Sequence, residues 1–363
     1  MSTTALDLAI IGAGAAGLHT ARRAMDRGVR LEVFDASARI GDSWRERYRS
    51  LRLFTPRRWA ELPGLRLDIG MFEYPTAAQL ADYLERYVTA FEIPVRTGIR
   101  VQRLSTAPNG LFHLELSTGE DVVADKVVVA AGAHHRPLLP GCAVDVDPAI
   151  RQVHSLEYRG PEDLATGSVL VVGAANSGTD IALEAAANGH ETVLAGRNPD
   201  QVPGRIDTPV GNLISSIFIR RLRNLTLDTE KGRRAWELQR GHGVNLVRNH
   251  LSDLRRAGIR QAGRLEGVQG GLPVLAGGER LRPATIVWCT GSEPIRDWID
   301  LPGYADEAGI HHDRGLSTTV PGLAFVGLPF QYSIASPTLM GMGRDAEYVV
   351  EHLLQPAPVL RAA

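Results

Sequence analysis

Short apolar runs alternate along the chain with segments whose apolar residues recur every three or four positions. The run from Leu6 to Ile11 has the length and composition of a buried strand, and His19 to Arg27 has helical spacing before Gly28. A second apolar run, "RLEVF", follows at residues 30–34. Strand, helix and strand in this order predict parallel strands joined by a helix, so the fold class is α/β.

The same pattern returns in the middle of the chain. Val169 to Val172 is an apolar run, an apolar helical segment ends near Ala187, and the run "ETVLA" at residues 191–195 follows Gly189. No other internal repeat and no low-complexity segment is present. We therefore expect two Rossmann-like dinucleotide-binding folds in one chain.

The turn after the first strand carries the spacing GxGxxG at Gly12, Gly14 and Gly17. The first glycine permits a tight turn, the second lets the backbone approach a pyrophosphate, and the third packs helix on strand. Asp35 ends the next strand, where a carboxylate can accept hydrogen bonds from a ribose diol. This loop, with Ala15 and Ala16 at the helix N-terminus, predicts a site for FAD.

The second turn reads Gly173-Ala174-Ala175-Asn176-Ser177-Gly178. No acid ends the strand that follows; Arg197 stands there, and an arginine attracts the 2′-phosphate that distinguishes NADPH. Arg197 as an ordinary solvated charge is the alternative. Ala175 replaces the middle glycine, and its methyl group would either push the backbone away from the pyrophosphate or change φ. We expect a weakened but intact NADPH site.

Composition narrows the classes of partner. The formal net charge of −1 gives no basic surface for nucleic acid, and no apolar run reaches the roughly 18 residues of a membrane span. Cys142 and Cys289 show neither a disulfide framework nor zinc spacing. The stretch "LAIIGAGAAGL" lacks the basic segment of a signal peptide, so we expect a cytoplasmic protein. Nothing here indicates an oligomeric state.

Other chemistry-bearing groups receive simpler interpretations. His134-His135 and His311-His312-Asp313 are interpreted as polar turn or strand-edge residues, because adjacent strand residues point to opposite faces and cannot easily share a metal ion. No metal is therefore predicted. No G-x-S-x-G elbow of a serine hydrolase is present. The run "FIRRLRN", Phe218 to Asn224, is interpreted as a solvated helix, with a basic membrane-facing surface as the alternative.

Four segments carry a family resemblance. The stretch from Ile40 to Leu65 contains "GDSWR", similar to a GG-x-W segment beside a flavin; "VVVAAGAHHRPLLPG" and "TIVWCTGSEP" resemble the two strands that cross between nucleotide domains. "PGLAFVGLPFQYSIASPTLMGMGRDAEYVVEHL" resembles a C-terminal flavin-binding segment. The chain thus resembles class B flavin-dependent monooxygenases over most of its length, especially their short single-chain bacterial members.

The resemblance implies an architecture and an activity. The FAD domain would comprise residues 1–145 and 288–363, with the NADPH domain, 146–287, inserted into it. NADPH would reduce FAD, and a flavin C4a-(hydro)peroxide would then oxygenate a small organic substrate by N- or S-oxygenation, hydroxylation or Baeyer–Villiger reaction. A helix from Met342 to Leu354 would point its N-terminus at the flavin. Further implied contacts are Gly41, Trp44, Arg45, Val101, Ala131, Gly132 and Gln331 for FAD, and Gly291 for NADPH.

The sequence also departs from the family pattern. The fingerprint FxGxxxHxxxY keeps His154 and Tyr158 but has Pro148 and Ile150 at its first two positions. Phe54 precedes Thr55 where many members have an asparagine. The cofactor carries most of the chemistry, so no catalytic acid or base is assigned. Candidates for the substrate pocket are Phe54, Thr55, Trp59, Gln331, Tyr332 and Met340.

Two other functions remain open. One is an FAD- and NADPH-dependent reductase or oxidase without oxygen transfer; the missing CxxC and the absence of an acid after Gly327 are features against the disulfide type. The other is a non-catalytic flavin-binding redox sensor, which Ala175 and the broken fingerprint favour. The substrate itself is not identified by the sequence.

Overall fold

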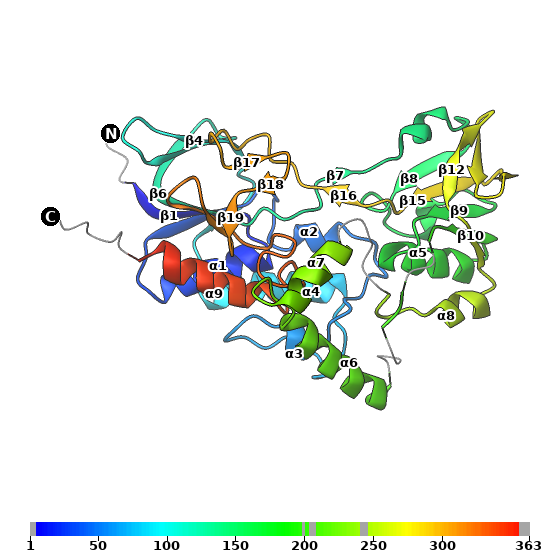
Figure 1. Cartoon of the computed structure of the whole chain (residues 1–363), viewed down its shortest axis with the longest axis horizontal. Helices are drawn as coiled ribbons and strands as arrows, with labels where there is room; N and C mark the ends of the chain where they lie inside the picture. The colour runs from blue at the N-terminus through cyan, green and yellow to red at the C-terminus, as the bar shows by residue number, and fades with distance from the viewer. Residues whose placement is uncertain (1–4, 198–199, 203–207, 240–245, 356–363) are drawn as a thin grey trace.

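The computed structural model describes residues 5–197, 200–202, 208–239 and 246–355. Figure 1 shows two lobes, each built on its own β-sheet, with the chain ends on one of them. The C-terminal helix returns to the lobe that contains the first strand, so the second lobe interrupts the first.

The first sheet has the order β19-β20-β21-β6-β1-β2-β3, and a meander of β4 and β5 joins it at β6. Strand β1 pairs in parallel with both β2 and β6; Leu8 lies opposite Leu31 on one side and Lys126 on the other. Its apolar residues are buried because helices cover the sheet. The strands are β1 (Leu6–Ile11), β2 (Leu31–Phe34), β3 (Val95–Arg96), β4 (Val101–Thr106), β5 (Phe112–Leu116), β6 (Asp121–Val129), β19 (His312–Asp313), β20 (Leu316–Ser317) and β21 (Leu323–Phe325).

Three helices pack in the first lobe. Helix α1 (Ala15–Met25) lies against α9 (Met342–Leu353), which brings the first glycine loop close to the C-terminal segment. Helix α4 (Ala77–Ala90) begins with a capping box, in which the Thr76 hydroxyl accepts from the Gln79 amide and the Gln79 side chain accepts from the Thr76 amide. The glycine-rich turns that precede α1 and α9 therefore lie in the same lobe.

The second sheet is parallel, in the order β11-β10-β9-β15-β8. Helix α5 (Asn176–Ala187) follows β9 and packs on the sheet; α8 (Leu251–Arg256) lies nearby. The strands are β8 (Arg151–His154), β9 (Val169–Val172), β10 (Thr192–Ala195), β11 (Arg260–Ala262) and β15 (Thr285–Trp288). A separate antiparallel sheet contains β12 (Leu265–Gln269), β13 (Leu272–Leu275) and β14 (Glu279–Arg280). Two short helices, η1 (Gly141–Asp145) and η2 (Pro161–Asp163), complete this part of the chain.

The two crossings between the lobes run side by side. Strand β7 (Arg136–Pro137) pairs antiparallel with β16 (Ser292–Glu293), and Arg136 Nε donates to Glu293 Oε1 at 2.7 Å. Figure 1 shows this ribbon between the two sheets. A second link comes from Tyr48, whose hydroxyl donates to Asp180 Oδ2 on α5 at 2.9 Å. The lobes are therefore joined both by chain and by a side-chain contact.

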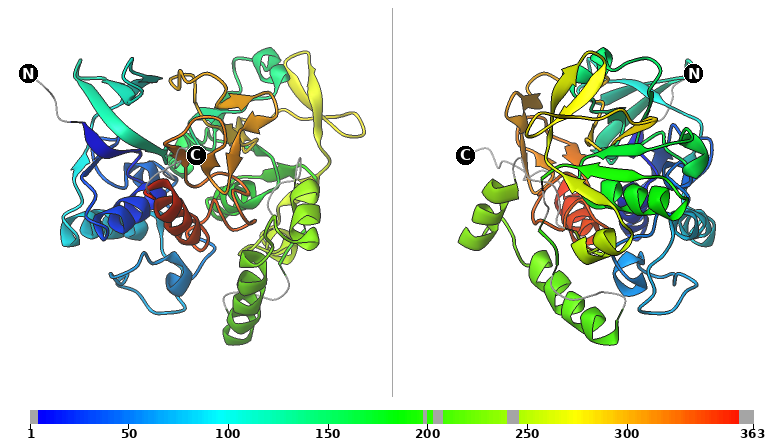
Figure 2. Two further views of the ribbon diagram at one scale, coloured as in Figure 1. Left: turned by 60° about the vertical axis from the view of Figure 1, so that its left-hand side comes forward. Right: turned by 90° about the vertical axis from the view of Figure 1, so that its right-hand side faces the viewer.

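The described segment 208–239 carries two helices that lie outside both sheets. Figure 2 shows α6 (Pro209–Arg223) and α7 (Glu230–Gln239) projecting from the body of the molecule. The segment after α6 is tied to the C-terminal segment, because Leu227 N donates to Tyr332 O and Ile334 N donates to Leu225 O. The remaining short elements are α2 (Asp42–Arg45), α3 (Arg57–Ala60), β17 (Ala305–Asp306) and β18 (Gly309–Ile310).

The predicted α/β architecture with two nucleotide-binding folds is confirmed. Helix α1 begins at Ala15, earlier than the spacing from His19 suggested, and ends before Gly28, whose φ is 71°. Within the described ranges, no helix has the length and hydropathy of a membrane span. Among the same residues, no group of three metal-ligating side chains occurs; the rings of His135 and His311 bond to backbone atoms.

Candidate active site

The first glycine loop has the geometry of a pyrophosphate cradle. Gly12 has φ 105°, and a Cβ there would lie 2.5 Å from the Ala130 oxygen at the end of β6. A Cβ at Gly17 would lie 1.8 Å from the Gly12 oxygen, so helix and turn touch. Gly14 precedes α1 and has open space where a Cβ would be. The amides of the first turn of α1 therefore face an accessible volume suited to an anion.

Asp35 stands at the carboxyl end of β2, beside this loop. Its Oδ2 accepts from Ala13 N at 2.6 Å and its Oδ1 from Ser37 N at 2.8 Å. The carboxylate thus fixes the turn and the segment after β2 together. Each oxygen retains lone pairs, so the half-buried group can also accept from a ribose hydroxyl.

The second loop reproduces the first. Gly173 has φ 110°, and a Cβ there would lie 2.2 Å from the Cys289 oxygen; a Cβ at Gly178 would lie 1.8 Å from the Gly173 oxygen. Ala175 precedes α5 with φ −79° and ψ −168°, close to the −71° and 179° of Gly14. These torsions are ordinary for any residue. Ala175 therefore needs no change of φ, and only its methyl group distinguishes the two loops.

The other predicted NADPH residues surround this loop. Asn176 begins α5 and its Oδ1 accepts from Val247 N at 3.2 Å; Ala174 and Ser177 are half-buried beside it. Arg197 is exposed just after β10. Gly291 lies at the crossing, and its oxygen accepts from Leu138 N. The assignment of these residues to NADPH stays a prediction.

The two residues that match the broken fingerprint, His154 and Tyr158, have structural roles. His154 Nε2 donates to Gly291 O at 3.0 Å, while its Nδ1 accepts from Leu156 N, which makes the ring neutral. Burial lowers the pKa of His154, in keeping with this state. The Tyr158 hydroxyl, fully buried, donates to Glu184 Oε2 at 2.8 Å on α5. His154 therefore fixes the second lobe to the crossing, and Tyr158 fixes α5 within that lobe.

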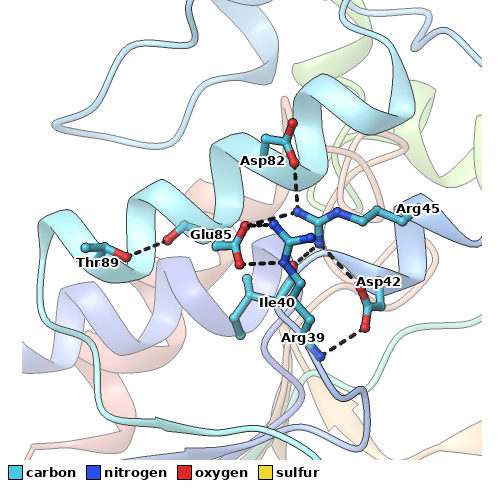
Figure 3. A network of polar contacts seen from close by, with 7 residues as sticks. All are labelled: Arg39, Ile40, Asp42, Arg45, Asp82, Glu85 and Thr89. Atoms are coloured by element: carbon cyan, nitrogen blue, oxygen red, sulfur yellow. Dashed lines mark hydrogen bonds and ion pairs between the residues drawn. The ribbon is translucent and has the colours of Figure 1, made fainter.

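The GG-x-W-like segment is clamped to α4. Gly41 has φ 86°, and a Cβ there would lie 2.7 Å from Ala81. Figure 3 shows the Arg45 guanidinium donating to Ile40 O, to Asp82 Oδ1 at 2.8 Å and to Glu85 Oε2 at 3.2 Å. Nη2 of Arg45 thus holds α2 on α4, whereas Nη1 bonds to Ile40 O in the segment before α2. Trp44 packs against the core of the first lobe. Contact of these residues with FAD stays a prediction.

The crossing segments enclose a small cavity on the side of the first sheet. Ala131 and Gly132 line it after β6, together with Trp298 and the segment after β21. His135 Nε2 donates to Ala131 O at 2.7 Å and thereby shapes this turn. Val101, the remaining predicted FAD residue, is buried at the start of β4.

Gln331 shapes the turn after β21, and its predicted contact with FAD stays a prediction. The side chain is fully buried; its Oε1 accepts from Gly327 N at 3.0 Å and Leu328 N at 3.3 Å, and its Nε2 donates to Arg314 O at 3.1 Å. These bonds shape the turn after β21. Gln331 therefore positions the C-terminal segment in this structure.

Two of the other substrate-pocket candidates, Trp59 and Tyr332, are linked through two arginines. The Arg223 guanidinium carbon lies 5.2 Å from the Trp59 ring centre, and Arg344 Nη1 donates to Arg223 O at 2.9 Å. Arg344 in turn lies 4.6 Å from the Tyr332 ring centre, and the Tyr332 hydroxyl donates to Asp228. Phe54 and Met340 are half-buried and Thr55 is buried.

Sequence reasoning missed these arginines. Arg223 lies in the run interpreted as a solvated helix; Arg220 and Arg221 are exposed as expected, but Arg223 is half-buried over Trp59. The sequence does place Arg223 at the end of an apolar helix, but nothing in the sequence links this arginine to Trp59 or Arg344. Tertiary packing alone brings them together.

Comparisons with known proteins agree with this geometry. The family model described as pyridine nucleotide-disulphide oxidoreductase matches residues 9–240. The "Uncharacterized oxidoreductase CzcO-like" of Geobacillus kaustophilus is 34% identical over 96% of this chain and 98% of its own length. "Indole-3-pyruvate monooxygenase YUCCA1" of Oryza sativa subsp. japonica is 33% identical over 52% of this chain and 47% of its own.

Solved structures share the whole fold. The flavin-containing monooxygenase from Stenotrophomonas maltophilia superposes with a TM-score of 0.77 at 24% identity, covering 97% of this chain and 98% of that one. OTEMO in complex with FAD and NADP gives 0.68 at 16% identity, covering 97% and 86%. The predicted cofactor pair agrees with this family and fold. The chain belongs to the pyridine nucleotide-disulphide oxidoreductase family of enzymes, and its resemblance to flavin-dependent monooxygenases is confirmed.

Proposed function

We propose that the protein is an FAD-dependent monooxygenase that uses NADPH and molecular oxygen to oxygenate a small organic substrate. The observation that carries the proposal is the duplication of one cradle: Gly12 to Gly17 and Gly173 to Gly178 have the same glycine contacts and matching torsions before α1 and α5. Two cradles in one chain suit an electron transfer between two dinucleotides.

The first cradle fits FAD. The open space at Gly14, the amides of α1 and the carboxylate of Asp35 match a pyrophosphate and a ribose diol. FAD supplies hydride acceptance and, once reduced, reaction with dioxygen. The first turn of α9 lies against α1 and would favour negative charge on the reduced ring.

The second cradle fits NADPH. The α5 N-terminus would hold the pyrophosphate, and Arg197 at the end of β10 would contact the 2′-phosphate. Ala175 narrows the approach by one methyl group without straining the backbone. The assigned division follows: residues 1–145 and 288–363 hold FAD, and 146–287 hold NADPH.

Dithiol chemistry is the less favoured alternative. Burial raises the pKa of the Cys289 thiol to about 12, so it is a poor source of thiolate at neutral pH. Both cysteines are free, and they lie 147 positions apart in sequence (289 − 142). Neither observation suits a reductase that cycles a disulfide of its own.

Isotopically labelled dioxygen tests the proposal. The FAD-loaded protein is given NADPH and a thioether such as thioanisole, and the sulfoxide is examined by mass spectrometry. One labelled oxygen atom in the sulfoxide, with catalase present, supports oxygen transfer. NADPH oxidation that yields only hydrogen peroxide with every thioether, amine and ketone supplied would assign the protein to the oxidases.

A further inference from the structure

A cluster of nitrogen donors without an acceptor lies between α3 and the end of α6. Its atoms are Nε and Nη2 of Arg58, Nε1 of Trp59 and Nε of Arg223, each buried and without a hydrogen bond in the described part of the chain. The guanidinium carbons of Arg58 and Arg223 lie 5.8 Å and 5.2 Å from the centre of the Trp59 ring. Figure 1 shows α3 next to one end of α6. We call these three residues the donor cluster.

Buried donors without acceptors lower the stability of the fold unless a ligand supplies the acceptors. Native proteins leave few buried donors unpaired, and two like charges around one ring repel each other. Two carboxylates of the adjoining segments are engaged elsewhere: Glu61 lies 3.1 Å from Arg57 Nε, and Asp228 accepts from Tyr332. Among the described residues, no acceptor bonds to these donor atoms, and such a group of donors suits an anion.

The donor cluster is linked to further substrate-pocket candidates. Arg344, in the first turn of α9, donates to Arg223 O and lies over Tyr332. Trp59 follows Phe54 and Thr55 closely in sequence, and Tyr332 follows Gln331. The cluster therefore connects the two chain segments that carry the substrate-pocket candidates.

We propose that the donor cluster binds the carboxylate of the substrate, so that the enzyme acts on small organic acids. This inference rests on the proposed function for the identity of the ligand as substrate. A guanidinium presents paired N–H groups that match a carboxylate, and the indole N–H adds a third direction. The flat Trp59 ring would contact an apolar or aromatic body. The phosphates of both dinucleotides have their own cradles at α1 and α5, which favours a carboxylate over a phosphate.

Binding to the oxidised, FAD-loaded protein tests this without turnover. Phenylacetate and neutral phenylacetamide, which share one shape, are titrated by calorimetry. We expect phenylacetate to bind at least about tenfold more tightly, and Arg58→Gln or Arg223→Gln to weaken it about ten- to a hundredfold. Arg220→Gln, an exposed position on the same helix, is the matched control and should change nothing.

Other results would overturn the assignment. Equal binding of acid and amide, no binding of phenylacetate, or an equal loss in Arg220→Gln would each do so. Weaker NADP⁺ binding in Arg223→Gln with unchanged phenylacetate binding would assign the cluster to a nucleotide phosphate instead. A failure of oxygen transfer leaves these titrations interpretable, and a failure of carboxylate binding leaves the proposed reaction in place.

Stability separates a binding role from a structural one. If Arg58 and Arg223 serve a ligand, Arg58→Gln and Arg223→Gln should unfold at a temperature no lower than the ligand-free parent, since each removes an unpaired donor and a repelling charge. A clear fall in unfolding temperature for both variants would mean that the arginines hold the fold, and would contradict the proposal. Arg58→Lys and Arg223→Lys keep the charge and should bind phenylacetate with intermediate affinity.

Discussion

Replacing Ala175 by glycine isolates the contribution of one methyl group to nucleotide binding. Gly14 and Ala175 occupy matching positions with nearly equal torsions, so neither substitution strains the backbone. Replacing alanine by glycine lowers the free energy of unfolding by about 0.4–1 kcal/mol, because the unfolded chain gains entropy. Glycine is also preferred over alanine at the position before a helix, and this preference offsets a similar free energy. The free energy of unfolding of Ala175→Gly should therefore change by less than about 1 kcal/mol.

The effect on binding should be larger than the effect on folding. A methyl group in front of the α5 amides lengthens the charge-assisted hydrogen bond from an amide to the pyrophosphate. If removing the methyl group restores about 1 kcal/mol of binding free energy, the Kd for NADP⁺ falls about fivefold. Calorimetric titration of NADP⁺ into the oxidised, FAD-loaded protein measures this without turnover. Gly14→Ala is the mirror experiment and should weaken FAD by a similar factor. An unchanged or weaker NADP⁺ affinity in Ala175→Gly would show that the methyl group does not face the pyrophosphate.

Three further outcomes are expected. Arg197→Ala should weaken the affinity for NADPH about ten- to a hundredfold and leave the affinity for NADH nearly unchanged, both measured from initial rates. An equal loss of affinity for both nucleotides would show that Arg197 does not bind the 2′-phosphate. Gly178→Ala should abolish NADPH binding, because the new Cβ would lie 1.8 Å from the Gly173 oxygen, whereas Gly267→Ala, which has no left-handed φ and no neighbour within 4 Å of its Cβ, should retain NADPH; normal affinity in Gly178→Ala contradicts the loop geometry. Burial, with a smaller effect of Arg23, lowers the pKa of His19 to about 4, so its neutral form is favoured in the fold. His19 should contribute up to about 3 kcal/mol to the loss of stability as the pH drops from 6.5 towards 4, so the loss measured by urea unfolding should be smaller by that amount in His19→Leu and unchanged in His352→Leu.

The two nucleotide folds were predictable because their signals are local. Strand, glycine turn and helix occupy consecutive residues, and the contacts of Gly12, Gly17, Gly173 and Gly178 are those that the spacing requires. The Gly28 stop of the first helix is equally local.

The site between the folds was not predictable in the same way. The Gln331 side chain bonds to the backbone of Gly327 and of Arg314, and only the folded segment reveals these contacts. Arg223 and Trp59 are far apart in sequence and meet because the segment after α6 pairs with residues 332–334. Arg45 likewise meets Asp82 and Glu85 through the packing of α2 on α4. Long-range contacts of this kind leave no periodic trace in a single sequence.

Double-mixing stopped-flow spectroscopy tests the central claim most directly. The anaerobic FAD-loaded protein is first reduced by NADPH and then mixed with dioxygen while the whole spectrum is recorded. The proposed monooxygenase should return to oxidised flavin in two phases, through a transient spectrum that differs from both end states and decays faster when substrate is present. Reoxidation in a single phase, with no transient spectrum at any dioxygen or NADP⁺ concentration and with substrate present, would contradict the account.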